Sequence, residues 1–371
     1  MAAGVAALCA LPAVVAALPV PGSPLTAAQL RARIMASAGR PYQGYAETDM
    51  NLDFPQLPDL GSVIGLLDGV TDQYAWYRSP GHWRSDVLQA ASEQDTYRVG
   101  RDTYVWDYSR GLLTRITGAQ PVRLPRAADL LPPALARRLL GFASPADRIS
   151  RLGSQRVAGV AAAGLRLVPA QPGTTIAAVD IWADPVTGLP VQVEVFGRAG
   201  SPGERAGSSR RAAAAPVLTS RFLDLTEQRP ALATVTPDPA PGVGVTTARL
   251  PDVSGILNAF APPLPGVLAG QRRAGVPAGL TDVAAYGSGF DRFAVLPLPA
   301  GTGTRALSVA LAAGAQIQLT GGTGVLVSTP LLNVVLARPS YGGPVYLLTG
   351  AVTAALLEQA ATDLMASVGS G

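Results

Sequence analysis

The residues that could carry covalent or metal chemistry are few in this chain. It has one histidine, His82, one cysteine, Cys9, and no lysine, so its 29 Lys and Arg residues are all arginine. The missing lysine excludes a Walker A lysine and a Schiff base, and one histidine cannot build an HExxH zinc site. A single cysteine excludes an internal disulfide and a CxxC motif. We therefore predict no metal site and no cofactor.

Carboxylates and small-residue motifs are the remaining candidates for catalysis. Tyr286-Gly287-Ser288-Gly289 lacks the first glycine of a nucleophile elbow, and Gly321-Gly322-Thr323-Gly324 lacks the third glycine of a dinucleotide site, so both are predicted to be turns. The strand carboxylates are spaced as on a solvated face: Asp49, Asp53, Asp86, Asp95, Asp107 and Asp180. A cryptic hydrolase stays as the least favoured alternative, and the prediction is that the protein is not an enzyme.

Aromatic side chains are the more informative group. They recur at period two between Asp72 and Tyr108, a spacing that places them on one face of a pleated sheet. The candidate ligand-binding residues are Tyr74, Trp76, Trp83, Tyr104, Trp106 and Trp182. They could line an apolar cavity, in which each buried methylene of an acyl chain contributes about 0.8 kcal/mol. They could equally fill a core between a sheet and helices, and the sequence leaves both readings open.

Turn signals indicate which elements position these aromatics. Ser79-Pro80-Gly81, Ala90-Ala91-Ser92 and Gly100-Arg101-Asp102 divide the aromatic stretch into four strands of a meander. Thr26 opens a capped helix before it, and residues 126–142 form a helical excursion broken by two prolines. With the later strands, the pattern predicts an α+β fold with one sheet of roughly ten antiparallel strands, and a sheet that large should curl.

Composition and breaks in pattern divide the chain into four parts. Residues 1–25 are an apolar signal sequence or membrane anchor, residues 26–228 form the sheet domain, residues 229–277 are a Pro/Gly-rich linker or extended wrap, and residues 278–371 form a smaller α+β domain. The apolar start predicts an exported protein. The net charge of +4 is small, and the arginines are scattered, so no nucleic-acid partner is predicted.

The order of elements and two short motifs resemble a known family. The hairpin Val179-Asp180-Ile181-Trp182-Ala183-Asp184-Pro185-Val186-Thr187-Gly188-Leu189-Pro190 is the most specific, and Tyr346-Leu347-Leu348-Thr349-Gly350-Ala351-Val352-Thr353 leads into the last helix. They resemble the LolA/LppX-like superfamily of bacterial envelope proteins, and within it the MucB/RseB-type sigma-factor regulators.

This resemblance implies a half-barrel sheet wrapped around helices and a hydrophobic cavity. It also implies lipid or lipoprotein acyl chains as ligands, and an anti-sigma factor or another envelope membrane protein as a partner. The expected function is thus a non-enzymatic, extracytoplasmic carrier or regulator. The alternative is an envelope interaction module with a filled core and no lipid ligand.

Overall fold

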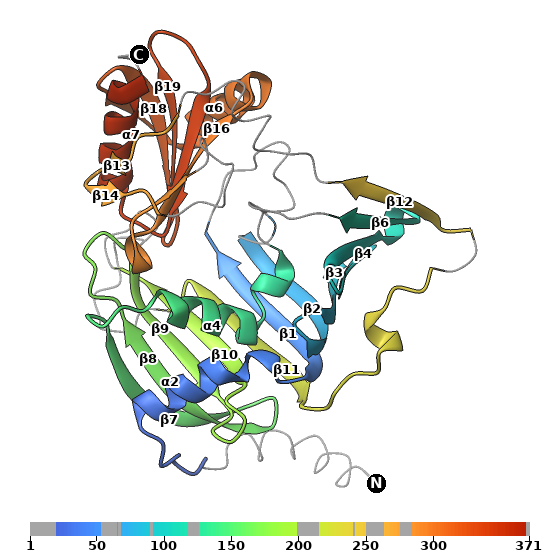
Figure 1. The fold of residues 1–371 in the computed structure, drawn as a ribbon. Coiled ribbons are helices and arrows are strands. Elements are labelled where there is room, and N and C mark those ends of the chain that lie inside the picture. Colours follow the sequence, from blue (N-terminus) through green and yellow to red (C-terminus); the bar gives the residue numbers. More distant parts are fainter. Residues whose placement is uncertain are drawn as a thin grey trace, which may run out of the picture.

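The computed structural model describes residues 20–52, 65, 68–89, 92–117, 126–198, 215–239, 242–249, 263–274 and 284–368 (Figure 1). Residues 1–19 of the predicted leader lie outside these residues. Within them, no helix is both long and apolar enough to cross a membrane.

The larger part is a curled sheet of twelve strands in the order β12-β6-β5-β4-β3-β2-β1-β11-β10-β9-β8-β7. Its strands are β1 (Tyr42–Asn51), β2 (Asp68–Ser79), β3 (His82–Gln89), β4 (Ser92–Val99), β5 (Asp102–Asp107), β6 (Leu112–Thr117), β7 (Arg148–Val157), β8 (Val160–Val168), β9 (Ile176–Ala183), β10 (Pro190–Gly197), β11 (Leu218–Thr226) and β12 (Gly244–Arg249). All neighbours pair antiparallel except β12, which runs parallel to β6. The predicted curled sheet is confirmed, with two strands more than expected.

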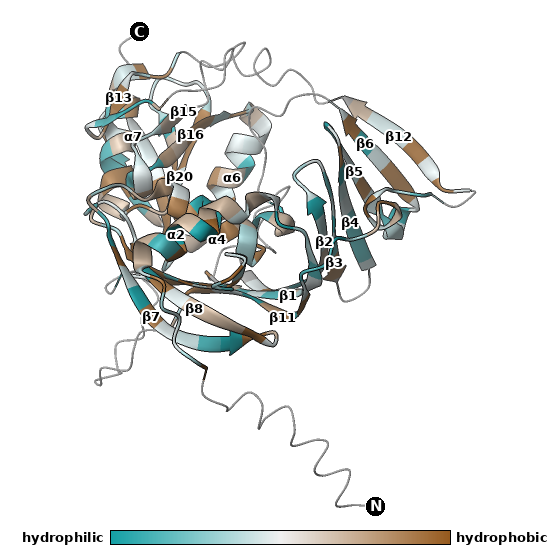
Figure 2. Ribbon diagram, turned by 60° about the horizontal axis from the view of Figure 1, so that its bottom comes forward, coloured by the Kyte–Doolittle hydropathy of each residue, from teal (hydrophilic) through white to brown (hydrophobic). Residues whose placement is uncertain are grey.

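Two helices cover the concave side of this sheet: α2 (Ala27–Ala36) and α4 (Pro132–Phe142) (Figure 2). The α2 helix begins at Thr26, whose side chain accepts from the Gln29 amide while the Gln29 side chain accepts from the Thr26 amide, as the predicted capping box requires. The two prolines of the excursion occupy the first turn of α4, where their missing amide hydrogens cost no hydrogen bond. Leu30 and Ile34 of α2 and Leu140 of α4 are fully buried.

The second part is a six-stranded sheet in the order β15-β16-β20-β19-β18-β17 with one helix on each side. Its elements are β15 (Ala284–Tyr286), β16 (Phe293–Leu298), α6 (Ala300–Ala313), β17 (Ala315–Leu319), β18 (Gly322–Ser328), β19 (Asn333–Pro339), β20 (Val345–Gly350) and α7 (Ala354–Val368). The apolar face of α7 packs on this sheet through Leu357 and Leu364. The smaller α+β unit predicted from the sequence is therefore present.

The two sheets share one hydrophobic core. A single cluster of buried side chains contains Leu30 and Ile181 from the larger part together with Val325 and Leu331 from the smaller one. Backbone contacts reinforce the junction, because the Thr175 amide donates to the Ala351 carbonyl oxygen at 3.0 Å. The predicted domain boundaries at residues 228 and 277 remain predictions. The hydrophobic core is continuous between the two parts and does not mark a boundary.

Part of the Pro/Gly-rich segment, residues 229–239, lies against the large sheet. Its short 3-10 helix Ala233–Val235 (η4) contacts β2, β3 and β4, and Val235 is fully buried. Farther on, β12 extends the large sheet, and the two-residue strands β13 (Val267–Leu268) and β14 (Gln271–Arg272) pair beside α7.

Candidate functional site

The candidate site is built on one row of directly paired residues that crosses β1 to β6. Antiparallel neighbours in register share a face of the sheet, so the row places its side chains together on the concave side. From β1 to β6 the row is Tyr42, Tyr77, Trp83, Arg98, Thr103 and Ile116. The Tyr42 and Tyr77 rings stack with centroids 5.2 Å apart.

A hollow of ≈ 490 Å³ lies between this row and the helical excursion. All six residues of the row border it, and on the other side it is bordered by residues of the short 3-10 helix Ala127–Asp129 (η3) and of α4. Ala134 and Arg137 are the α4 residues among them, and Leu131, which directly precedes α4, also borders the hollow. This volume falls in the range of ordinary small-molecule sites, which are about 300–1,000 Å³. We refer to this space as the concave hollow.

Local sequence explains why the excursion can form this wall. Gln73, fully buried on β2, donates from Nε2 to the Ala127 carbonyl oxygen at 3.1 Å, and Ser85 on β3 donates to Gln73 Oε1 at 2.9 Å. These bonds fix η3 over the sheet next to the hollow. The α4 helix then continues beside it with Arg137 on the near side.

The charge of the hollow is dominated by arginine. Arg84, Arg98, Arg101, Arg126 and Arg137 border it, and Asp129 is the one carboxylate among its described lining residues. Burial favours the neutral form of both groups here. It lowers the pKa of Arg137 and raises the pKa of the neighbouring Tyr42 hydroxyl. The hollow thus combines aromatic and apolar walls with positive charge.

The opposite face of the meander carries a second cluster, centred on Arg84. Its guanidinium lies 5.0 Å from the centroids of both the Trp76 and Tyr97 rings, in cation–π contact. It also pairs with Asp86 at 2.7 Å and with Asp95 at 2.8 Å. Asp86 and Asp95 face each other directly across β3 and β4.

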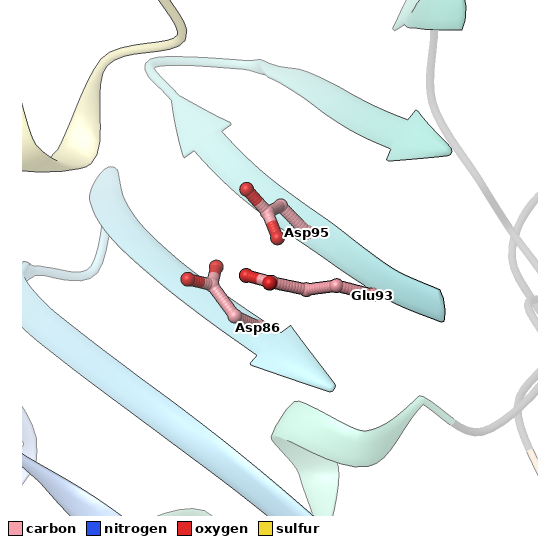
Figure 3. A group of neighbouring side chains, drawn as sticks. All are labelled: Asp86, Glu93 and Asp95. Carbon is pink, nitrogen blue, oxygen red and sulfur yellow. The ribbon is translucent and has the colours of Figure 1, made fainter. Parts of the chain in front are cut away.

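Three carboxylates meet in this cluster (Figure 3). Oxygen atoms of Asp86, Glu93 and Asp95 lie within 4.8 Å of one another, close enough in principle to share a cation. Arg84 already supplies positive charge to two of them, and the Tyr97 and Tyr108 hydroxyls both donate to Asp95 at 3.1 Å. Burial raises the pKa of Asp86 to about 7, opposed by Arg84 and assisted by the charge of Asp95. The arrangement therefore fits a retained proton better than a metal ion.

The structure separates the six predicted ligand-binding residues. Trp83 belongs to the row that forms the hollow. Trp76 pairs with Arg84 in a row of the opposite face, and it also borders the hollow. Tyr74, Tyr104 and Trp106 lie in rows of that opposite face. Trp182 donates from Nε1 to the Gly153 carbonyl oxygen at 3.2 Å and packs in a buried cluster.

Other residues at the hollow were not predicted from the sequence. Tyr42, Tyr77, Arg98 and Arg137 come from four separate elements, and only the register and the position of α4 bring them together. A partial signal existed, because Tyr77 and Trp83 flank the predicted Ser79-Pro80-Gly81 turn.

The predicted solvated face of strand carboxylates is wrong at three positions. Asp86, Asp95 and Asp180 are 2%, 0% and 3% exposed. Each is buried with an arginine, since Arg84 pairs with the first two and Arg166 Nε donates to Asp180 at 2.6 Å. Spacing alone could not reveal these partners, because they lie on neighbouring strands.

Comparison with known proteins gives similarity at the level of solved structures. No protein-family model and no curated protein matches the chain. A structure of Pseudomonas aeruginosa MucB with MucA aligns over 90% of this chain and 96% of that one, at 18% identity and a TM-score of 0.49. A structure of MucB by itself aligns over 90% and 96% at 16% identity and a TM-score of 0.43.

A LolA superfamily protein from Nitrosomonas europaea aligns over 58% of this chain and 99% of its own, at 14% identity and a TM-score of 0.24. These proteins bear the names of the family that the hairpin and the C-terminal motif resemble. The chain is thus similar to LolA-like and MucB structures, as the sequence predicts.

Proposed function

We propose that this protein is an exported, non-enzymatic protein of the cell envelope that binds lipid or lipoprotein acyl chains in the concave hollow. The observation that carries the proposal is the row of paired residues from Tyr42 to Ile116, which lines a hollow under α4. The lining combines aromatic and aliphatic side chains with arginines, so it offers both apolar contact and polar groups that can orient a ligand. No described constellation of nucleophile and base competes with this use of the hollow.

The proposed role is to report or carry such a ligand within the envelope, in a sigma/anti-sigma pathway. The family resemblance of the sequence supports this role. In the solved complex MucB is bound to MucA, and we propose a membrane-associated anti-sigma factor as the corresponding class of partner here.

A filled-core interaction module is the second candidate, and one observation favours it. Fully buried side chains of α2 and α4, such as Leu30, Ile34 and Leu140, pack in the hydrophobic core on the concave side. Only the half of the sheet from β1 to β6 borders the hollow.

Uptake of a fluorescent fatty acid, together with native mass spectrometry for co-purified lipid, separates the two. We expect saturable uptake, and a loss of about tenfold in affinity for Trp83→Ala, because an aromatic contact and its buried area are removed from the wall. Trp106→Ala is the matched control, since Trp106 lies on the opposite face and its loss should leave affinity unchanged.

The outcomes distinguish the candidates. A well-folded protein that neither carries lipid nor takes up the probe contradicts the lipid-binding proposal and leaves the interaction module. Equal loss of affinity in both tryptophan variants would show that the binding site is not the concave hollow.

A further inference from the structure

Resting on the proposed function, we infer that the concave hollow selects an amphiphile with an anionic group, a carboxylate or a phosphate, and that Arg137 and Arg98 hold this group. The apolar part of the ligand would lie along the aromatic and aliphatic members of the row, such as Trp83 and Ile116.

Arg137 is the first reason. Its side chain is half-buried on α4 at the wall of the hollow, and among the described residues it donates one hydrogen bond, to Ser37 Oγ at a long 3.5 Å. Burial lowers its pKa, and the titratable groups beside it are the hydroxyls of Tyr42 and Tyr77. Among the described residues no carboxylate pairs with it. A cation that loses water without gaining a counter-ion is costly, and an anionic ligand would remove that cost.

Arg98 is the second reason. It sits in the centre of the row, between Trp83 and Thr103, and its side chain donates to neutral oxygens only, the Gly100 carbonyl at 3.1 Å and Thr103 Oγ1 at 3.1 Å. No described carboxylate pairs with it either. A guanidinium held in place by such bonds keeps further N–H donors, which suit the planar oxygens of a carboxylate or phosphate.

The balance of charge around the hollow points the same way. Asp129, the carboxylate of the described lining, already accepts from the Arg126 amide at 3.0 Å, where it caps η3. Arg84 also borders the hollow, but its charge is already neutralised by Asp86 and Asp95. Arg98 and Arg137, in contrast, border the hollow without a carboxylate partner among the described residues.

Binding of four probes to the full chain tests the inference: dodecanoate, dodecyl phosphate, methyl dodecanoate and inorganic phosphate. We expect each of the two anionic amphiphiles to bind at least about tenfold more tightly than the methyl ester, because only they gain charge-assisted hydrogen bonds. Inorganic phosphate should bind more weakly than dodecyl phosphate, because it lacks the apolar chain. The two anionic amphiphiles also show whether carboxylate or phosphate is preferred.

Variants assign the effect to the arginines. Arg137→Gln and Arg98→Gln should each reduce the preference for dodecanoate over its methyl ester by about tenfold, while binding of the ester itself stays nearly unchanged. Arg138→Gln is the matched control, because this neighbour on α4 is exposed and does not border the hollow. Circular dichroism verifies that each variant is folded.

Three results would overturn the inference. One is equal affinity for dodecanoate and its methyl ester, which leaves the acyl-chain proposal intact. Another is a preference that survives in both Arg137→Gln and Arg98→Gln. The third is inorganic phosphate binding as tightly as dodecyl phosphate, which would identify a plain anion site. If none of the four probes binds, the proposed function fails together with the inference.

Discussion

At the scale of single residues, the cluster around Arg84 shows how burial favours the protonated form of one strand carboxylate, Asp86. Asp86 and Asp95 are opposite each other across β3 and β4, where like charges destabilise a sheet, and one arginine serves both. Burial raises the pKa of Asp86 from 3.8 to about 7, and burial with the charge of Asp95 raises that of Glu93.

This shift predicts a pH dependence of stability. Between the unfolded and folded pKa values of Asp86 the folded protein binds more protons than the unfolded chain, so the free energy of unfolding falls as pH rises. We expect a decrease on the order of 2 kcal/mol from pH 5 to pH 8 in urea titrations, since one pKa unit is about 1.4 kcal/mol. Asp86→Asn should remove a large part of this decrease.

Asp107→Asn is the control for that measurement. Hydrogen bonds from Ser109 and Arg110 lower the pKa of Asp107, so its titration ends below pH 5 and its removal should not alter the slope between pH 5 and pH 8. An unfolding free energy that is just as pH-dependent in Asp86→Asn as in the parent protein would assign the dependence to other groups.

At the scale of elements, the β9–β10 hairpin is tied to α2. Arg33 on α2 donates from Nη1 to the Pro185 carbonyl oxygen in the hairpin turn. Gly188 in the same turn has φ +76°, and a Cβ there would collide with the Arg33 backbone oxygen. The turn residues that carry the family resemblance therefore also pack against α2 and hold this helix on the sheet.

Gly188→Ala should destabilise the protein more than Gly159→Ala. Gly159, in the β7–β8 turn, has a similar φ of +80° but open space around its Cβ position, so its substitution costs only left-handed strain of about 1–2 kcal/mol. Gly188→Ala adds a backbone collision, and we expect a loss larger by about 1–3 kcal/mol in urea titrations. Equal losses would show that the turn can move away from α2.

At the scale of the whole molecule, the continuous core couples the two sheets. Leu331 from the smaller part is buried among residues of the larger one, and its carbonyl oxygen accepts from Thr175 Oγ1 at 2.5 Å. All four tryptophans lie on the large sheet, at positions 76, 83, 106 and 182, so their fluorescence reports only that part.

Unfolding should accordingly be one transition for both parts. Leu357→Ala creates a cavity between α7 and the small sheet, away from every tryptophan, and should cost about 2–5 kcal/mol. We expect the fluorescence transition in urea to shift as far as the far-UV circular dichroism transition. A shift in circular dichroism alone would show that the smaller part unfolds independently.

The sequence by itself determined the local elements. Thr26 predicted the cap of α2, three turn signals predicted the strands β2 to β5, and Asp184 to Gly188 predicted the turn of the β9–β10 hairpin. These features depend on backbone conformation within a few residues, which residue type controls directly. The period-two aromatics likewise indicated a shared face, and Tyr74 and Trp76 do share one.

Only the tertiary structure decided which face of the meander borders the hollow. A period of two in the sequence predicts that alternate side chains share a face of the sheet. Which face the helices cover depends on the path of the chain after residue 126. The helices lie on the face of Tyr77, Trp83 and Arg98, and the Arg84 cluster takes the other. The register across six strands and the position of α4 depend on contacts between residues far apart in the sequence. The residues of the site could therefore be identified only from the tertiary structure.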